Sequence, residues 1–123
     1  MLNSRQQFGK TGESIAVKEL TTLGYTILEK NFRAKPGEID IIAKDKETIV
    51  FVEVKARRTK SFGNAKYSIT PGKQRKISMT ALIYLKQKSM MKKKARFDVI
   101  IIHPDNNNRA VEIIKNAFDL SYK

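Results

Sequence analysis

The chain contains no cysteine, and among its 123 residues it has a single histidine, His103. The lack of cysteine excludes disulfide bonds, thiolate metal centres and a cysteine nucleophile, and it agrees with a cytoplasmic location. One histidine cannot build a multi-histidine zinc site. Any metal ion must therefore be bound by oxygen ligands, which favours Mg²⁺, Mn²⁺ or Ca²⁺.

Long apolar segments are also missing. No run approaches the roughly 20 apolar residues that a membrane-spanning helix needs, and the polar segment 1–14 lacks the apolar core of a signal peptide. With 41% hydrophobic and 30% charged residues, the composition is that of a globular protein rather than a disordered chain. We therefore expect a single cytoplasmic domain over 1–123, without membrane association.

Negative charge is scarce. Twelve Asp and Glu stand against 25 Lys and Arg, which gives a net charge of +13. This balance favours a polyanionic partner, most simply nucleic acid, and the alternative is a generally basic, solvated surface. An anionic membrane surface fits less well, because no long basic amphipathic helix with bulky apolar anchors is present.

Hydrophobic spacing and turn residues divide the chain into seven elements. Apolar residues at helical spacing predict a helix over 4–23, which Gly24 ends, and a second helix over 71–88 with Thr70 as its N-cap. Strands are expected at 25–32, 38–44, 48–56 and 96–103, with a final strand or short amphipathic segment at 109–118. The order α-β-β-β-α-β-β implies an α/β fold, with a mixed β-sheet flanked by helices.

The most informative stretch is the hairpin over 37–58, with the sequence GEIDIIAKDKETIVFVEVKARR. Alternation divides its second strand into two faces, with Val50, Val52 and Val54 on one and Ile49, Phe51, Glu53 and Lys55 on the other. Both faces begin apolar, so the strand is covered on both sides and its charged end needs partners. With residues 46 and 47 at the tip, Asp40 lies opposite Glu53, and Glu38 lies opposite Lys55.

Two opposed carboxylates repel each other unless a cation lies between them. Asp40, Glu53 and the carbonyl oxygen of Val54 could hold a hard divalent ion, and Lys55 could hold or deprotonate a water molecule that attacks a phosphodiester. A network of ion pairs, in which Lys55 neutralises Glu38 and Glu53, produces the same pattern and remains an alternative.

The motif GEIDIIAKD followed by FVEVKARR resembles the PD-(D/E)XK nuclease superfamily, with Ile39 where the motif name has proline. The longer set FGKTGESIAVKEL, GYTILEKNFR, GEIDIIA and FVEVKAR resembles the YraN-type family of predicted endonucleases, which is related to archaeal Holliday-junction resolvases. The resemblance covers nearly the whole chain and implies a restriction-endonuclease-like core. It also implies that Asp40, Glu53 and Lys55 form the active site, with Glu13 as a further acidic residue that contacts metal or water.

Other residues have two interpretations each. Glu13 near the start of a helix is also favoured there by the helix dipole. Gln74 could orient a water molecule or contact a phosphate, or could be an ordinary exposed residue. Glu38 is either an accessory ligand or the ion-pair partner of Lys55, while Asp98 is interpreted as structural.

Basic residues form three groups that we expect to surround the acidic site and to bind nucleic acid. The groups are Arg33 and Lys35, then Arg57, Arg58 and Lys60, and then Lys73, Arg75 and Lys76. The third group opens the second helix, whose N-terminal N–H groups also attract phosphate.

The residues and the resemblance together predict an endonuclease that depends on Mg²⁺ or Mn²⁺ and acts on structured or branched DNA. A basic nucleic-acid-binding protein that keeps the nuclease fold without catalysis is the main alternative, and a structural or partner-binding protein of the nucleoid or ribosome surface is a third. A homodimer would suit an enzyme that cuts two strands.

Overall fold

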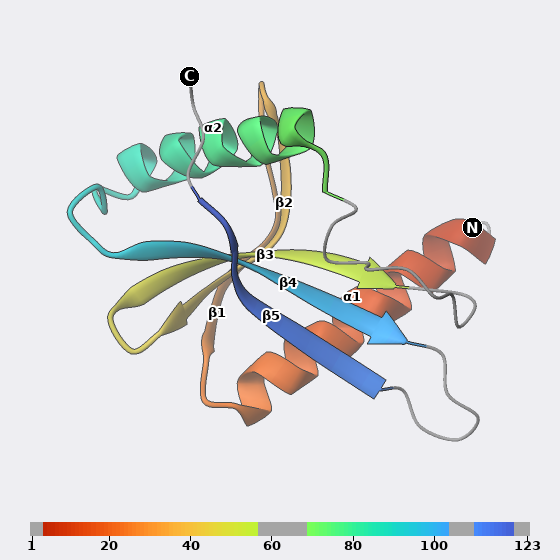
Figure 1. Ribbon diagram of the computed structural model, residues 1–123. Coiled ribbons are helices and arrows are strands. Elements are labelled where there is room, and N and C mark those ends of the chain that lie inside the picture. The colour runs from red at the N-terminus through yellow and green to blue at the C-terminus, as the bar shows by residue number, and fades with distance from the viewer. Residues whose placement is uncertain (1–3, 57–68, 104–109, 120–123) are drawn as a thin grey trace.

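The computed structural model of the protein describes residues 4–56, 69–103 and 110–119, which form two helices and five strands (Figure 1). In chain order these are α1 (Ser4–Thr22), β1 (Thr26–Ala34), β2 (Gly37–Asp45), β3 (Thr48–Ala56), α2 (Pro71–Gln87), β4 (Ala95–His103) and β5 (Ala110–Phe118). The predicted α-β-β-β-α-β-β order is confirmed, and the last segment is a strand.

The end of α1 and the start of α2 are determined by residues at these positions. Gly24 follows α1 with a φ of +94°, a left-handed conformation that glycine adopts without strain. At the start of α2, the Thr70 side chain accepts a hydrogen bond from the Lys73 N–H (3.1 Å), and Pro71 occupies the first turn. Both boundaries agree with the prediction from sequence.

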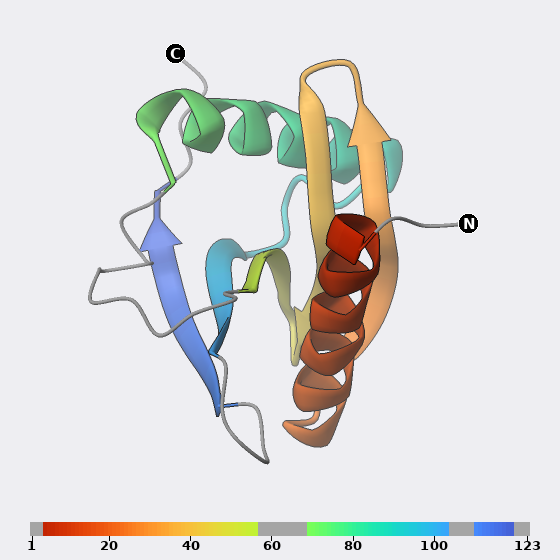
Figure 2. The same ribbon diagram turned by 90° about the vertical axis from the view of Figure 1, so that its right-hand side faces the viewer.

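The five strands form one mixed sheet in the order β1-β2-β3-β4-β5. Only the β3–β4 pair is parallel, and α2 lies between these two strands in the sequence. The two helices lie on opposite faces of the sheet (Figures 1 and 2). Among the described residues, no helix is long and apolar enough to cross a membrane.

Strand β3 is the centre of both hydrophobic layers. Ile49 and Phe51 pack beneath α2, while Val50 and Val52 pack against the α1 side, and each is at most 1% exposed. The prediction that this strand is covered on both faces is thus confirmed. Burial of each large apolar side chain contributes about 1.5–3 kcal/mol, so this central strand contributes strongly to the stability of the core.

Strand β2 changes sides where it reaches Asp40. Ile41 belongs to the α1 layer, but Ile39, two residues earlier, packs in the α2 layer, so the alternation of a flat strand is broken between them. Opposite this position on β1 lies Asn31, whose φ is +54°. The irregularity places Asp40 at the boundary between the two layers, half-buried rather than enclosed.

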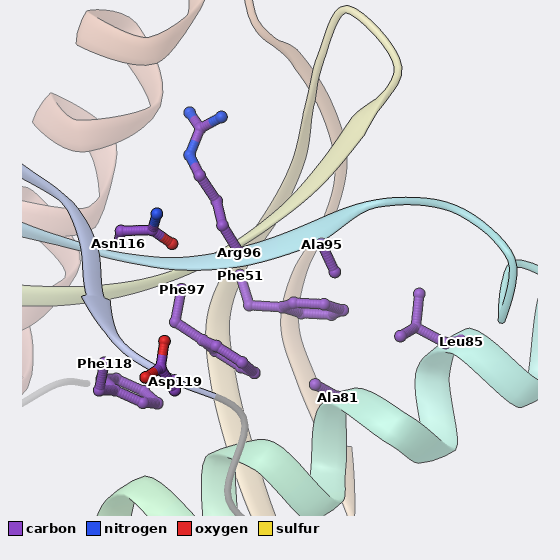
Figure 3. A pocket seen from close by; sticks show the side chains of 9 residues that line it. All are labelled: Phe51, Ala81, Leu85, Ala95, Arg96, Phe97, Asn116, Phe118 and Asp119. Carbon is purple, nitrogen blue, oxygen red and sulfur yellow. The ribbon is translucent and has the colours of Figure 1, made fainter.

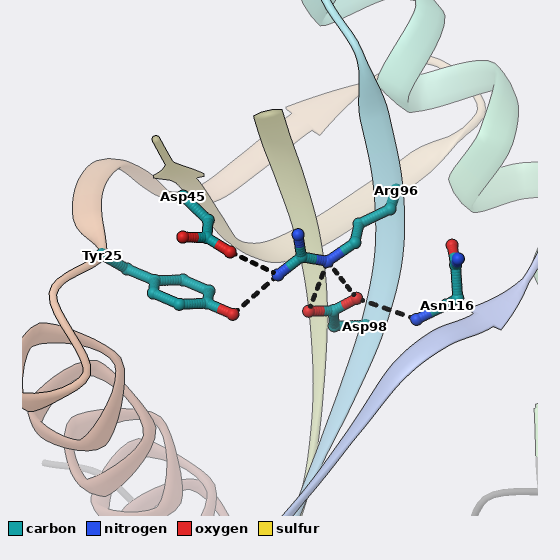
Figure 4. A network of polar contacts seen from close by, with 5 residues as sticks. All are labelled: Tyr25, Asp45, Arg96, Asp98 and Asn116. Carbon is teal, nitrogen blue, oxygen red and sulfur yellow. Dashed lines mark hydrogen bonds and ion pairs between the residues drawn. The ribbon is translucent and has the colours of Figure 1, made fainter. Parts of the chain in front are cut away.

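A polar cluster centred on Arg96 connects β2, β4, β5 and the segment after α1 (Figure 4). The Arg96 Nε lies 3.1 Å from both carboxylate oxygens of Asp98, and its Nη2 donates to the Tyr25 hydroxyl (2.6 Å) and to Asp45 (3.2 Å). Asp98 also accepts the backbone N–H of Asn116 at 3.1 Å. Burial alone would lower the pKa of Arg96, but its bonds to Asp98 raise it, so the guanidinium stays charged. These contacts agree with a structural role for Asp98.

Candidate active site

The hairpin of β2 and β3 brings Asp40 and Glu53 to one place. Its turn lies at Lys46 and Glu47, and the pairing runs from Asp45 with Thr48 to Ile41 with Val52. The regular pairing ends there, and beyond it Asp40 and Glu53 line the same cleft. There a side chain replaces the backbone as hydrogen-bond acceptor, because the Asp40 carboxylate accepts the Val54 N–H at 2.8 Å.

Asp40 and Glu53 lie in an open cleft of about 270 Å³ between the sheet and the first turns of α2. Its lining comprises Gly37, Glu38, Asp40, Glu53, Lys73, Lys76 and Ile77. The cleft therefore combines carboxylates from two strands with lysines from a helix, at a position that a ligand can reach from solvent.

The carboxylate of Glu53 is paired with Lys73. The Lys73 Nζ lies 2.9 Å from the Glu53 Oε1, and Glu53 is only 9% exposed. The sequence predicts Lys73 among the basic residues around the site, whereas the structure places its ammonium inside the cleft. Burial alone would lower the pKa of Lys73, but its hydrogen bond to Glu53 and the charge of that carboxylate raise it.

Lys55 lies beside the same carboxylate, on the α2 face of β3. Burial and then the positive charge of Lys73 lower the pKa of Lys55, and the charge of Glu53 opposes part of that change. Of the two lysines, Lys55 is consequently the one that gives up a proton more easily. A neutral amine can accept a proton from a water molecule, which an ammonium cannot do.

Asp40 is surrounded by an excess of negative charge. Burial first, and then the charge of Glu53, raise the pKa of Asp40 from 3.8 to about 7, with smaller increases from Glu13 and Glu38. The hydrogen bond from the Val54 N–H opposes this increase. Without a further cation, the Asp40 carboxyl is therefore partly protonated at neutral pH.

The ion-pair partner of Glu38 is Arg33, so the predicted pair with Lys55 is wrong. Antiparallel pairing of β1 with β2 sets Arg33 directly opposite Glu38, and the Nε–Oε2 distance is 3.0 Å. A cross-strand neighbour within the β1–β2 hairpin reaches Glu38 first. Arg33, expected to bind nucleic acid, remains 78% exposed as a side chain while it makes this contact.

Glu13 approaches the site because of the glycine before it. A Cβ atom at Gly12 would lie 3.0 Å from the Cβ of Ala56, so the missing side chain lets α1 lie close to the end of β3. Asn31 then connects two acidic residues: with its amide nitrogen facing the carboxylates, it donates to the Oε1 atoms of Glu13 (3.2 Å) and Glu38 (3.1 Å). Sequence reasoning missed Asn31, since nothing local distinguishes it from an ordinary polar strand residue.

The remaining predicted residues are less central. Gln74 donates its side-chain amide to the Ile69 carbonyl (3.0 Å), which fixes the entry into α2. Lys35, Arg75 and Lys76 are exposed near the cleft or on the first turns of α2, and Lys76 lines the cleft. Val54 contributes its N–H, and metal binding by its carbonyl stays a prediction. The structure does not describe the positions of Arg57, Arg58 and Lys60.

The donor set fits a hard divalent cation by its chemistry. Carboxylate oxygens are the ligands that Mg²⁺ and Mn²⁺ prefer, and the raised pKa of Asp40 marks negative charge that a cation would neutralise. The present arrangement is not a finished metal site, however. Within residues 4–56, 69–103 and 110–119, no three acidic or histidine side chains converge in a geometry that could hold an ion, and Lys73 occupies one oxygen of Glu53.

A second cavity, of about 110 Å³, lies between α2 and strands β4 and β5 (Figure 3). Its walls are largely aromatic: Phe97 stacks between Phe51 and Phe118, at centroid distances of 5.5 and 4.8 Å. The guanidinium of Arg96 points away from these rings. This cavity belongs to the core beneath α2, and of these two the first cleft is the one that holds Asp40 and Glu53.

A family model matches residues 12–102, and its description is "Uncharacterised protein family UPF0102". The chain belongs to this family. Its relatives include UPF0102 proteins of Desulfosudis oleivorans, 56% identical over 97% of this chain and 95% of the relative, and of Geotalea daltonii, 53% identical over 98% and 95%. The family predicted from the sequence motifs, known from YraN-type proteins, is thereby confirmed.

Among solved structures, this UPF0102 protein is similar to SfsA of Pyrococcus furiosus, which was determined in complex with Ca²⁺. The TM-score is 0.42 at 15% identity, and the alignment covers 90% of this chain and 62% of SfsA. Such a distant similarity supplies no residue roles for the UPF0102 protein. The candidate site therefore depends on the geometry of the cleft.

The raised pKa of Asp40 predicts how the stability of the metal-free UPF0102 protein varies with pH. The pKa of Asp40 is about 7 in the folded state against an ordinary 3.8. The protonated Asp40 carboxyl therefore contributes fully to stability below pH 4, and this contribution is lost as the pH rises through 7. In chelator, Asp40→Asn should therefore be more stable than the wild type at pH 8 by about 2 kcal/mol, with little gain at pH 4.5. Thermal unfolding at both pH values measures this; an equal effect at both would contradict it, and Glu19→Gln on α1, outside the cleft, is the control.

Proposed function

We propose that this UPF0102 protein is a metal-dependent endonuclease that hydrolyses phosphodiester bonds of nucleic acid, with structured or branched DNA as its substrate. The observation that supports this most is the meeting of Asp40, Glu53 and Lys55 at one end of the β2–β3 hairpin, beside an open cleft. Family membership and the net charge of +13 agree with a nucleic-acid substrate.

Each residue of the cleft has a defined task in this proposal. Asp40 and Glu53 hold Mg²⁺ or Mn²⁺, with Glu13 close enough to influence the charge of Asp40. When bound, the cation supplies electrostatic stabilisation of the negative charge that develops on the scissile phosphate. Lys55, whose pKa is lowered, orients the attacking water molecule and accepts its proton.

The nucleic-acid backbone would be bound by the basic residues around the cleft. Lys35, Arg75 and Lys76 are exposed there, and Arg33 can exchange its contact with Glu38 for a phosphate. Such contacts are independent of sequence, so recognition would follow the shape of the substrate. The proposal includes a homodimer for one reason, which is that two subunits could cut two strands.

The decisive experiment is a cleavage panel over linear, flapped and four-way DNA and matched RNA, with Mg²⁺, Mn²⁺ or chelator. We expect cleavage that requires the metal ion and prefers a branched substrate. Asp40→Asn should lower the rate by about 10³-fold or more, since it removes a ligand charge but keeps an acceptor for the Val54 N–H. Metal-dependent cleavage that survives in both Asp40→Asn and Glu53→Gln would exclude this active site.

One observation favours the second candidate, a non-catalytic nucleic-acid-binding protein. The pair between Lys73 and Glu53 neutralises the buried carboxylate without any metal ion. A protein of this kind should bind nucleic acid equally well in chelator and should cleave no substrate in the panel. In either case, the affinity for duplex DNA should fall with salt, with a log–log slope of about −0.9 per phosphate contact.

A further inference from the structure

Lys73 and Glu53 come from opposite walls of the cleft. Glu53 lies on β3 with its side chain 11% exposed, while Lys73 reaches it from the first turns of α2 with a side chain that is 43% exposed. A carboxylate this deeply buried needs a positive partner, and the ammonium of Lys73 provides one at 2.9 Å.

The position of Lys73 conflicts with the proposed use of Glu53. A cation shared by Asp40 and Glu53 would have to approach the carboxylate to which the Lys73 ammonium is already bonded. Two positive charges at such close range repel each other, and more strongly in a partly buried cleft than in water. The ammonium and a divalent ion therefore compete for Glu53.

The Lys73 ammonium has a possible alternative partner, a phosphate bound in the cleft. Its side chain is long and flexible, and Lys76, one turn further along α2, lines the same cleft and is exposed. A phosphate that enters the cleft would meet both lysines and the N-terminal N–H groups of α2. Lys55, also beside Glu53, lies on the strand and can stay in the site.

We propose that Lys73 is an exchangeable internal cation: it pairs with Glu53 in the metal-free protein, and a divalent ion displaces it towards the nucleic-acid phosphate. This inference rests on the proposed nuclease function of the cleft. Because the displaced ammonium binds phosphate, the metal ion and nucleic acid strengthen each other's binding. Lys73 is thus a positioning residue that delays full substrate binding until the metal ion is present.

The test measures binding of Mn²⁺ alone by calorimetry, without a cleavage assay. Lys73→Met, which keeps the apolar stem and removes the charge, should bind Mn²⁺ about tenfold more tightly than the wild type. Lys76→Met removes the same charge from the same cleft without removing a bond to Glu53, and it should change the affinity by less than about twofold. Equal or weaker Mn²⁺ binding by Lys73→Met would overturn the inference.

A thermal series tests the same exchange in another way. In chelator, Lys73→Met should unfold at a lower temperature than the wild type, because Glu53 loses its partner. Added Mn²⁺ should raise the melting temperature of Lys73→Met by more than it raises that of Lys76→Met. If Lys73→Met does not fold, Lys73→Gln replaces it, since an amide can still donate to Glu53 without charge. No gain in Mn²⁺ affinity in that variant equally counts against the exchange.

Coupling to nucleic acid completes the test. A four-way DNA junction with Ca²⁺, in place of a cation that supports cleavage, should bind the wild type about fivefold more tightly than in chelator, and Lys73→Met should lose most of that gain. If the wild type binds neither Mn²⁺ nor Ca²⁺ at millimolar concentration, the proposed function itself fails. If it binds them with affinities that Lys73→Met leaves unchanged, only the role of Lys73 fails.

Discussion

Replacing Asp98 by alanine is expected to lower the free energy of unfolding by about 3–5 kcal/mol. Asp98 is 1% exposed, and its carboxylate neutralises Arg96 while it accepts the N–H of Asn116. Its loss leaves a half-buried guanidinium with only Asp45 and Tyr25, and it leaves a backbone N–H of β5 without its acceptor. The melting temperature should fall by more than about 10 °C in thermal unfolding, and a urea titration measures the loss of free energy.

One further variant separates the charge of Asp98 from its hydrogen bond, and one control variant breaks an exposed ion pair. Asp98→Asn keeps an oxygen for the Asn116 N–H but removes the charge, so it should fall between the wild type and Asp98→Ala. Glu112→Ala breaks the exposed pair with His103 and should cost less than about 0.5 kcal/mol. A loss below about 1 kcal/mol in Asp98→Ala would show that the Arg96 cluster does not stabilise the fold.

The second large effect concerns catalysis. Replacing Lys55 by methionine is expected to lower the rate of metal-dependent cleavage by about 10²–10⁴-fold. The reason is the position of its amine beside Glu53, with a pKa lowered by burial and by Lys73. Binding of nucleic acid should change by less than about threefold, since other basic residues provide most of the attraction. Single-turnover cleavage with a labelled flapped DNA measures the step directly.

Replacing Lys55 by arginine distinguishes a role in proton transfer from a purely electrostatic role. Lys55→Arg keeps the positive charge but cannot accept a proton, so it should be nearly as inactive as Lys55→Met. Lys115→Met, on the exposed face of β5, removes one positive charge far from the cleft and should leave the rate unchanged. Full activity in Lys55→Arg would show that the residue acts only through its charge.

Much of this fold follows from local patterns. The β-branched alternation of β3, the polar turn at Lys46 and the Thr70–Pro71 start of α2 predict their elements because each depends on near neighbours in sequence. The same local logic places Asp40 opposite Glu53, since the register of a short hairpin is determined by its turn.

The partners of the charged groups could not be predicted in this way. Lys73 and Glu53 are 20 residues apart, and their contact depends on how α2 packs over the sheet. The register of the β2–β3 hairpin alone offers Lys55 as a partner for Glu38, yet Arg33 of β1 lies directly across from it. Asn31 contacts Glu13 only because a helix and a hairpin approach each other at Gly12.

The bulge in β5 has a consequence for the behaviour of the protein in concentrated solution. β5 is an edge of the sheet, and between Phe118 and Ile114 three of its residues face the single residue Asp98 of β4. Asn116 has a φ of +55°, and its N–H is turned to the Asp98 side chain, so β5 departs from regular strand geometry at this point. This irregularity disfavours the addition of another chain to β5 as a regular extra strand.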